Sequence, residues 1–526
     1  MRSFPKAHLN FVSRKQFKSK DAQFIVDFLR KHPGHAKSIR KFCESLENPD
    51  KKCMSKEQAL NVLVTAKLTK CQYNFIRDAT SETGHECFPS YYQVQKAKNE
   101  CYPRKENIKI TDTSVDINLQ SLLDKTSERL LQVVDKKQFT NLVLISKWGC
   151  DGASDQSQYK ISFNNELSDD SSLFACSLVP IKLYDSITGT VIWKNNKPSS
   201  TRMCRPISLQ FVKETSETIN ATIEHVNSQV KLLTPSNCTN DTSITHKLCL
   251  TMIDGKICNN ITKTQSSMRC YICQASPKEM NNLKKINTKV VNEEYYSYGM
   301  SSLHAWIRCF ECLIHISYNI PFKTWSIRNP ESKLQRENRK KEIQNKFRSK
   351  LGLLVDIVKQ GKGTSNDGNT ARTFFSNYQV SSEITDIDVD LIKRIYVILQ
   401  TISSGQKINI EKFKNYTFQA AELYVNLYNW YYMPASMHKL LMHGAEIIEH
   451  AIVPIGLLGE DAQEANHKFI RDYRENYSRK ISRIANNEDI IHNMLLQSDP
   501  VISSLRSNKT TKHKELLPEA LELLEM

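Results

Sequence analysis

The sequence predicts a mixed α/β fold, in which a sheet is covered by helices and is followed by a long helical region. β-branched and apolar runs separated by turn residues occupy most of the stretch between about residues 141 and 262. Residues 216–233 interrupt these strands with the apolar spacing of a helix, and helical patterns then continue to about residue 450. Strands followed by a helix and a further strand are typical of a mixed sheet with helical cover.

Composition narrows the class of partner. The chain has 526 residues, which is enough for several domains, and Lys and Arg exceed Asp and Glu by 73 to 56. The net charge of +17 suits a partner covered in phosphates, either nucleic acid or an anionic membrane. No apolar run reaches the ~18 residues of a membrane span, and no signal-peptide core follows the basic start. We therefore expect a nucleic-acid partner and no membrane.

Cysteine usage indicates an intracellular protein. The 15 cysteines are odd in number, and most stand alone in apolar stretches, as Cys176, Cys249 and Cys258 do. Such cysteines are typical of reduced thiols and not of a disulfide framework. An intracellular DNA-binding protein is the class that charge and cysteines favour together.

The first 140 residues are expected to bind DNA and lead into the sheet. Residues 1–54 form a basic arm that either touches the DNA backbone or is a solvated tail. Residues 55–105 predict short helices that begin after a capping box at Ser55, at Thr69 and near Pro89. Short helices with exposed Lys, Arg, Gln and Tyr suit a helix-turn-helix-type DNA reader, although many small helical domains look similar. Residues 106–140 are expected to be a linker.

Two predicted strands end in Asp-Gly. The strand at residues 141–150 ends at Asp151, and the strand at residues 246–253 ends at Asp254. A carboxylate at the end of a central strand lies at the rim of the sheet, where a substrate can reach it. Asp-Gly is also a common turn signal, so one such site would mean little. Two of them, in strands expected to be neighbours, make a paired-acid site a real alternative.

A third acid is needed for metal-dependent phosphoryl transfer. Two Mg²⁺ ions that activate the attacking oxygen and neutralise the leaving one need about three converging carboxylates. A predicted helix at residues 459–484 offers Glu460 and Glu464, one turn apart, ahead of a basic run that starts at Lys468. An ordinary charged surface helix would look the same.

A zinc site is the other candidate constellation. Cys270 and Cys273 form a C-x₂-C pair, and His438 and His443 form a distant H-x₄-H pair. Four such ligands make a closed, tetrahedral structural zinc site, although both histidines could be ordinary helix residues. A second group, Cys309, Cys312 and His315, lies inside a strongly apolar helix, where core packing is favoured. No organic cofactor is indicated.

Several ordered motifs resemble the Transib transposases and the related catalytic subunit of the V(D)J recombinase. In chain order they are Cys150-Asp-Gly-Ala-Ser-Asp155; Lys197-Pro-Ser-Ser-Thr-Arg-Met-Cys-Arg-Pro206 with Glu214-Thr-Ser; Asp254 ahead of Cys270; Gly368-Asn-Thr-Ala-Arg-Thr-Phe374; His438 and His443; and Gln463-Glu464 with Lys468. The likeness covers roughly residues 55–500. A RING-type zinc module is absent ahead of these motifs, which favours the compact transposase.

The resemblance implies a ribonuclease-H-like catalytic core interrupted by a large zinc-binding helical insertion. It implies a dimerisation and DNA-binding domain at 55–105, a core at 141–262, an insertion at 263–458, catalytic-core helices at 459–500 and a tail at 501–526 that frays after Arg506. Asp151, Asp254 and Glu464 would hold Mg²⁺ or Mn²⁺, and Cys270, Cys273, His438 and His443 would hold Zn²⁺.

The same resemblance implies a cut-and-paste transposase that works in the nucleus as a homodimer. It would bind terminal inverted repeats, nick the DNA, form hairpins on flanking DNA and join the ends to target DNA. Two alternatives stay open: a domesticated or inactive copy that binds DNA without cutting it, and a zinc-stabilised interaction protein without a nucleic-acid role. Glu460 and Asp461, beside Glu464, leave the identity of the third acid open.

Overall fold

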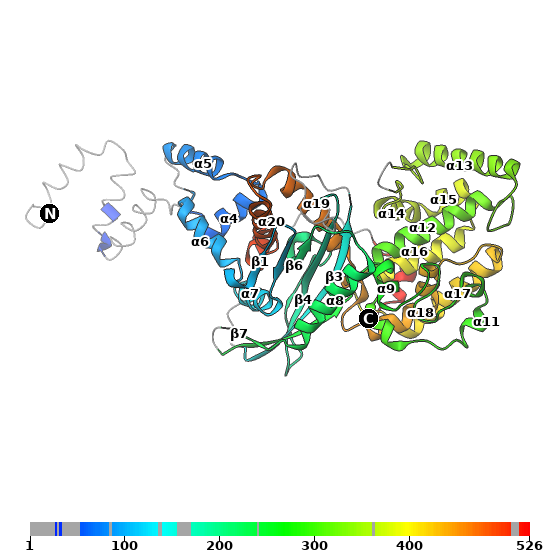
Figure 1. Cartoon of the computed structure of the whole chain (residues 1–526), viewed down its shortest axis with the longest axis horizontal. Coiled ribbons are helices and arrows are strands. Elements are labelled where there is room, and N and C mark those ends of the chain that lie inside the picture. The colour runs from blue at the N-terminus through cyan, green and yellow to red at the C-terminus, as the bar shows by residue number, and fades with distance from the viewer. Residues whose placement is uncertain are drawn as a thin grey trace, which may run out of the picture. The chain divides into compact units, whose positions relative to one another are not determined.

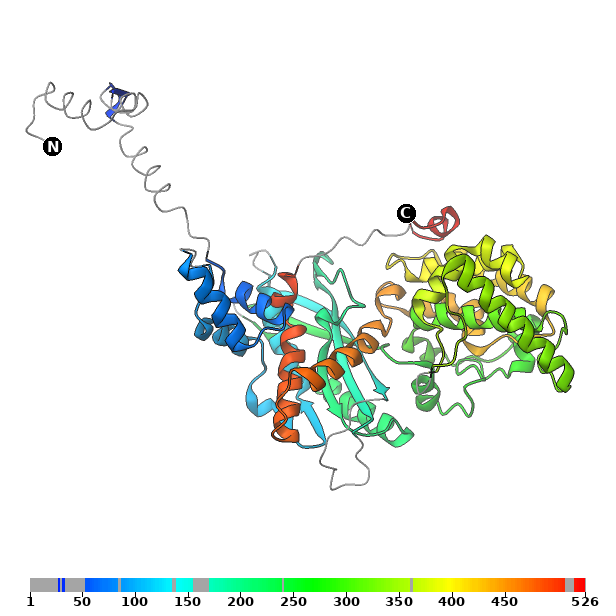
Figure 2. The same ribbon diagram turned by 90° about the horizontal axis from the view of Figure 1, so that it is seen from above.

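The structure is a computed structural model that describes residues 27–28, 31–33, 53–83, 87–134, 139–154, 170–238, 241–359, 363–506 and 515–525 (Figures 1 and 2). The chain divides into two compact units, Met1–Ala97 and Lys98–Met526, which are described separately. The sequence pattern also predicts a short helix at residues 21–31, which lies mostly outside the described residues, and a strand at residues 159–163, which lies wholly outside them.

The described part of the first unit is helical. It contains α4 (Lys56–Thr65), α5 (Lys70–Glu82) and most of α6 (Tyr91–Glu100). Capping boxes built on Ser55 and Thr69 begin α4 and α5, which confirms those two predicted starts. The Tyr73 hydroxyl, on a fully buried ring, donates to the Pro89 carbonyl at 2.7 Å and ties α5 to the segment that leads into α6.

The second unit contains the predicted mixed sheet. Its strands follow the order β1-β2-β6-β4-β3-β8-β7, and β5 pairs with β4 at its far end. The strands are β1 (Ile108–Ile110), β2 (Ser114–Ile117), β3 (Asn141–Ala153), β4 (Leu173–Asp185), β5 (Val191–Lys194), β6 (Arg205–Gln210), β7 (Ser236–Asn237) and β8 (Ser243–Leu250). β3 and β8 are parallel neighbours, and the other pairs are antiparallel. The mixed α/β class is therefore confirmed.

Helices from both ends of this unit cover the sheet. α7 (Leu119–Leu131) packs with α8 (Ser216–Lys231), whereas α19 (Asp461–Asn476) lies on β3 and β4 and α20 (Arg483–Gln497) lies on β1, β2 and β6. The single helix expected at residues 459–484 is wrong. α19 ends at Asn476, and a new helix begins after Ser482, whose side chain caps it by accepting from the Ala485 N–H at 3.1 Å.

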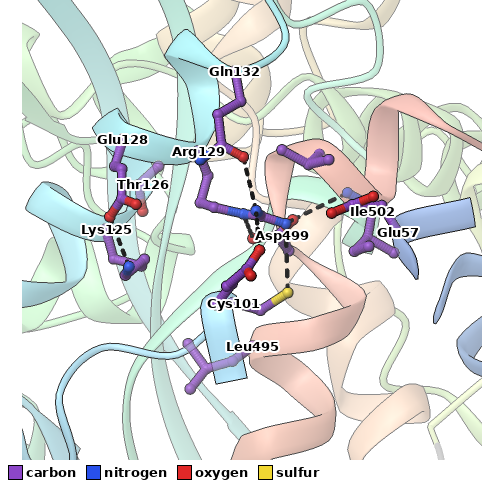
Figure 3. A network of polar contacts seen from close by, with 12 residues as sticks. Glu57, Cys101, Lys125, Thr126, Glu128, Arg129, Gln132, Leu495, Asp499 and Ile502 are labelled. Atoms are coloured by element: carbon purple, nitrogen blue, oxygen red, sulfur yellow. Dashed lines mark hydrogen bonds and ion pairs between the residues drawn. The ribbon is translucent and has the colours of Figure 1, made fainter. Parts of the chain in front are cut away.

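A buried ion pair closes the core around α20. The Arg129 guanidinium, on α7, donates twice to the Asp499 carboxylate at 2.9 Å, and also to Gln132 and to the Cys101 sulfur (Figure 3). Asp499 is the N-cap of α21 (Pro500–Ser504), which directly follows α20. Breaking a buried pair of this kind costs about 3–5 kcal/mol, so it holds the C-terminal helices on the sheet.

Between β8 and α19 the chain forms a helical region. Its helices of four residues or more are α9 (Gly255–Ile261), α10 (Pro277–Met280), α11 (Leu283–Ile286), α12 (Ser302–Asn319), α13 (Pro330–Leu351), α14 (Gly368–Ser376), α15 (Tyr378–Thr385), α16 (Val389–Ser403), α17 (Ile410–Tyr428) and α18 (Ala435–His450). The sequence pattern predicts a helix at residues 331–358, which is longer than α13. α13 stops at Gly352, which adopts φ +65° and closes the helix with a left-handed cap.

The C-terminal tail was expected to fray, and for residues 515–525 this is wrong. α22 (Pro518–Glu522) packs on α16, with Ala520 fully buried. The Lys393 ammonium forms an ion pair with Glu519, and Ile408 forms a β-bridge with Leu524. These contacts bury apolar side chains that would otherwise stay in water, which is why the tail is ordered.

Two further expectations can be compared with the described residues. No disulfide bond joins the cysteines in that part of the chain, as predicted. No single described helix is long and apolar enough to cross a membrane, and one bent pair, Ala435–His450 with Ile455–Asn476, meets the length and composition test only together.

Candidate functional site: a carboxylate cluster and a cysteine–histidine cluster

The face of β3 that carries Asp151 lies under α19. Side chains alternate along a strand, so Lys147, Gly149 and Asp151 share one face. The Lys147 ammonium donates to the Gly459 carbonyl, just before α19, at 2.6 Å. Farther along α19, His467 Nδ1 lies 3.6 Å from Asp151 Oδ2. β3 continues through Asp151 to Ala153, so this acid lies within a paired strand and not after its end.

Asp254 is held beside β3 by the close approach of the chain that follows β8. A Cβ on Gly149 would lie 1.9 Å from the Met252 carbonyl oxygen, so only glycine permits this approach. Asp254 is the N-cap of α9, and its Oδ1 accepts from the Ile257 N–H at 2.8 Å. Because β3 and β8 are parallel, their C-terminal ends lie at one edge of the sheet, where the two aspartates are brought together.

The pKa of Asp151 indicates which other acids lie near it. Burial first, and then the negative charges of surrounding carboxylates, raise the pKa of Asp151 well above its ordinary value. In order of decreasing effect these carboxylates belong to Asp254, Glu460, Glu214 and Glu464. Acids from β3, the start of α9, the start of α19 and the loop before α8 therefore share one region.

The two glutamates of α19 have different surroundings. Glu460 is buried; it accepts a hydrogen bond from the Ser301 hydroxyl at 2.6 Å and contacts His304 Nδ1. Burial opposes a charge on His304, yet the hydrogen bond and charge of Glu460 raise the pKa of that imidazole. Glu464 is exposed, and within the described residues no hydrogen bond or ion pair engages its carboxylate. Although the residue as a whole is exposed, desolvation of its carboxyl group raises the pKa of Glu464, and so do the charges of Glu460 and Asp461, whereas the charge of His304 lowers it.

Glu214 is a member of the cluster to which sequence reasoning gave no role. Its Oε2 forms an ion pair with the Lys256 ammonium at 3.0 Å, and it would lie 2.7 Å from a Cβ on Gly152. Its Oε1 is buried and has no hydrogen-bond partner. Burial first, and also the charge of Asp254, raise the pKa of Glu214. The one available signal was its place inside a motif shared with the resembled family.

The donor set fits hard divalent cations. Oxygen ligands from carboxylates suit Mg²⁺ or Mn²⁺, and a buried oxygen of Glu214 and another of Glu460 lack a partner. The carboxylate oxygens of this cluster are farther apart than the ligand atoms of a preformed metal site. Among the described residues, the group with three or more candidate ligand atoms within 4.8 Å of one another is the cysteine–histidine set. Repulsion among uncompensated carboxylates is a sufficient physical reason for wider spacing.

The four residues expected to bind zinc do meet. Ligand atoms of Cys270, Cys273, His438 and His443 all lie within 4.8 Å of one another, and all four residues are buried. Cys273 Sγ and His438 Nε2 are 3.4 Å apart although 165 residues separate them in the chain. A hydrogen bond from Cys273 lowers the pKa of the Cys270 thiol to about 7, which favours a thiolate ligand. This donor set fits a closed tetrahedral zinc site.

The competing group, Cys309, Cys312 and His315, does not meet. Both cysteines are buried on α12, and Cys312 Sγ lies 3.6 Å from the Tyr424 hydroxyl. His315 instead lies 3.7 Å from the Asp356 carboxylate. The core-packing interpretation is confirmed for Cys309 and Cys312, whereas His315 is partly exposed.

A cavity of about 640 Å³ runs between the two clusters. Asp254 and His304 line it on the carboxylate side, and Cys270 lines it on the other. Its basic lining residues are Lys256, Arg269, Arg308 and Lys439. A cavity with an acid at one end and several cations along its wall can accept a phosphate-containing chain.

Residues 143–268 match the family model of the recombination-activation protein 1 (RAG1) RNase H domain. This segment includes Asp151, Glu214 and Asp254. The expected relationship to the recombinase is thereby confirmed for these residues, whereas the narrower Transib assignment stays a prediction. No curated protein matches the chain.

The solved structures that match include the Drosophila P element transposase strand transfer complex. It is 8% identical, with a TM-score of 0.33, and the match covers 89% of this chain and 98% of that one. A TM-score this low does not define a shared fold.

Proposed function

We propose that this protein is a DNA transposase or recombinase whose active site is the carboxylate cluster, with Asp151, Asp254 and Glu464 as the metal ligands. The observation that carries the proposal is the convergence of acids around Asp151, within a segment that matches an RNase H domain. Two bound Mg²⁺ or Mn²⁺ ions would activate an attacking oxygen and stabilise the leaving one. Glu464 is preferred to Glu460 because Glu460 is already engaged by Ser301 and His304.

Each of these residues would have a distinct part. Asp151 is fixed within the long central strand β3, and Asp254 is fixed by its hydrogen bond to the α9 backbone. Glu464 would complete the site from the first turn of α19. Glu214 would be a fourth acid and would position Lys256 through their ion pair. Lys256, Arg308 and Lys439 would contact phosphates of DNA in the cavity.

The remaining functional assignments belong to the same proposal. Cys270, Cys273, His438 and His443 would hold a structural Zn²⁺ that joins the start of the helical insertion to α18. The helices of the first unit would bind DNA. A homodimer in the nucleus would bind terminal inverted repeats, nick DNA, form flanking hairpins and transfer strands to target DNA, as a Transib-type transposase would.

The test is a cleavage assay on a plasmid that carries the genomic sequences flanking the coding region, with Mn²⁺ as the cation. We expect nicks and hairpin ends from the wild-type protein. Asp151→Asn and Asp254→Asn should each reduce them by about 1,000-fold or more, which corresponds to about 4 kcal/mol of activation free energy. Asp390→Asn, on an exposed residue of α16, is the matched control and should cut normally.

Three outcomes would contradict the proposal. Products that persist in Asp151→Asn or Asp254→Asn would remove these aspartates from the active site. Tight binding to the flanking sequences without any product would favour a domesticated, DNA-binding protein. Binding to DNA that does not weaken between low and moderate salt would argue against phosphate contacts altogether.

A further inference from the structure

Lys147 is a buried cation that the proposed chemistry does not use. In the described part of the chain it is the one buried lysine, with 0% of its surface exposed. It lies on β3, on the same face as Asp151 and four residues before it. Its ammonium donates to the Gly459 carbonyl at 2.6 Å, and the carboxylates of Asp461 and Glu460 are close enough to stabilise its charge.

Burial makes this charge expensive. Moving an ammonium out of water costs several kcal/mol, and replacing a buried ion by a well-packed apolar residue is often neutral or stabilising. Burial lowers the pKa of Lys147 to about 8, so the side chain is still mostly charged at pH 7. Stability alone does not explain a lysine here, and a methionine would fill the same space.

The lysine is one of the polar anchors that hold the start of α19 on the sheet. Another is Gln463, whose amide donates to the Ala175 carbonyl at 3.0 Å. Ala175 is the residue of β4 that pairs with Asp151. Lys147 therefore holds the chain just before α19, and Gln463 holds its first turn. Glu464 is the residue next to Gln463, so both anchors bear directly on where its carboxylate lies.

We propose that Lys147 is a positioning residue of the carboxylate cluster, which holds the start of α19 so that Glu464 faces Asp151 before any cation binds. This rests on the proposed function. The carboxylates repel one another in the absence of cations, and α19 can carry Glu464 away from Asp151 unless its start is tied to β3. The hydrogen bond to the Gly459 carbonyl supplies that tie.

The test is Lys147→Met, measured by the concentration of Mn²⁺ that half-saturates thermal stabilisation of the zinc-loaded protein. We expect this concentration to rise about tenfold, the smaller end of the effect of removing a group that orients a metal ligand. Lys147→Gln keeps an N–H donor without the charge and should lie between Met and wild type. Asp151→Asn gives the baseline, because its Mn²⁺ stabilisation should be absent.

Arg205→Met is the matched control. Arg205 is also a fully buried cation on the sheet, but it donates to the Leu495 carbonyl and to Thr126 and not to a residue of the carboxylate cluster. Its replacement should lower the melting temperature and leave the Mn²⁺ requirement unchanged.

The loss of the Lys147 charge and the loss of its positioning role would change the Mn²⁺ requirement in opposite directions. Removing a positive charge near carboxylates would by itself tighten cation binding, so a lower Mn²⁺ requirement in Lys147→Met would overturn the proposal. An unchanged requirement, or a variant that no longer folds, would make Lys147 a purely structural residue and would overturn it too. If wild type binds Mn²⁺ but cuts no DNA, the proposed function fails while the Mn²⁺ measurement still tests Lys147.

Discussion

The two clusters in the second unit differ in how complete they are. The cysteine–histidine cluster is buried, and its four ligand atoms lie within 4.8 Å of one another. The carboxylate cluster draws acids from four elements, leaves Glu464 exposed and spaces its members more widely. Structural metal sites are closed by their own ligands, whereas catalytic sites keep positions open for substrate. The difference in packing therefore separates a site that holds the fold together from one that is held by it.

Opposite electrostatics accompany this difference. A hydrogen bond from Cys273 lowers the pKa of the Cys270 thiol, whereas the same hydrogen bond and burial raise the pKa of Cys273, so folding prepares one of the two thiolates that a zinc ion would need. In the second cluster, burial and like charges raise the pKa of Asp151 and of Glu464. Folding brings these acids together against their mutual repulsion. The carboxylate cluster should thus cost stability where the cysteine–histidine cluster adds it.

The largest expected effect is the loss of the cysteine–histidine cluster. Cys273→Ser, or a strong zinc chelator, should lower the melting temperature by more than about 10 °C, because a structural zinc site supplies folding free energy directly. Differential scanning calorimetry with metal analysis measures both changes. Cys312→Ser, on the buried cysteine that is not in the cluster, should not change the zinc content. If the protein keeps its full stability after zinc removal, the cysteine–histidine cluster does not stabilise the fold, and the contrast between the two clusters is wrong.

The second-largest expected effect is a gain in stability and not a loss. Asp151→Asn removes a negative charge from the repelling acids, so the protein without divalent cations should become more stable by about 1–3 kcal/mol. Chemical unfolding in the presence of zinc but without Mg²⁺ measures this. An exposed substitution such as Asp390→Asn should change stability by less than about 0.5 kcal/mol. A destabilised Asp151→Asn would show that the acids are not under repulsive strain.

The stability gained by Asp151→Asn should depend on pH, which makes the second prediction sharper. The pKa of Asp151 is raised in the folded protein, so folding takes up protons in the window between the unfolded and folded pKa values. The stability of the wild type therefore falls, relative to Asp151→Asn, as pH rises through that window. Below it Asp151 is protonated and resembles asparagine, and the gain should vanish. If the extra stability of Asp151→Asn stays constant from pH 4 to pH 8, it comes from packing and not from the removed charge.

Much of this arrangement was predictable because it depends on local pattern and on spacing. The apolar run before Asp151 predicts a central strand, and the two Asp-Gly ends predict neighbouring strands, which β3 and β8 are. The cysteine and histidine pairs were predictable because zinc restricts residue type and number. Asp151, Asp254 and Glu464 remain predictions as catalytic ligands.

The elements that sequence reasoning missed depend on tertiary contacts. Glu214 joins the acids only because Gly152 leaves room for it, and Lys147 is buried only because α19 returns to β3 after the whole insertion. The packing of residues 515–525 likewise follows from contacts with distant parts of the chain. Local periodicity carries no record of such partners.

The smallest expected effect tests the cavity between the clusters. Lys439 lines it from α18 and donates to the Tyr271 hydroxyl at 3.2 Å, which aims its charge along the wall. If DNA phosphates occupy the cavity, Lys439→Ala should weaken DNA binding several-fold and reduce the salt dependence by about one unit of slope. Lys247→Ala, on an exposed residue of β8 that does not line the cavity, should change neither quantity. Equal effects from both lysines would mean that the cavity receives no DNA, and that the carboxylate cluster is approached from another side.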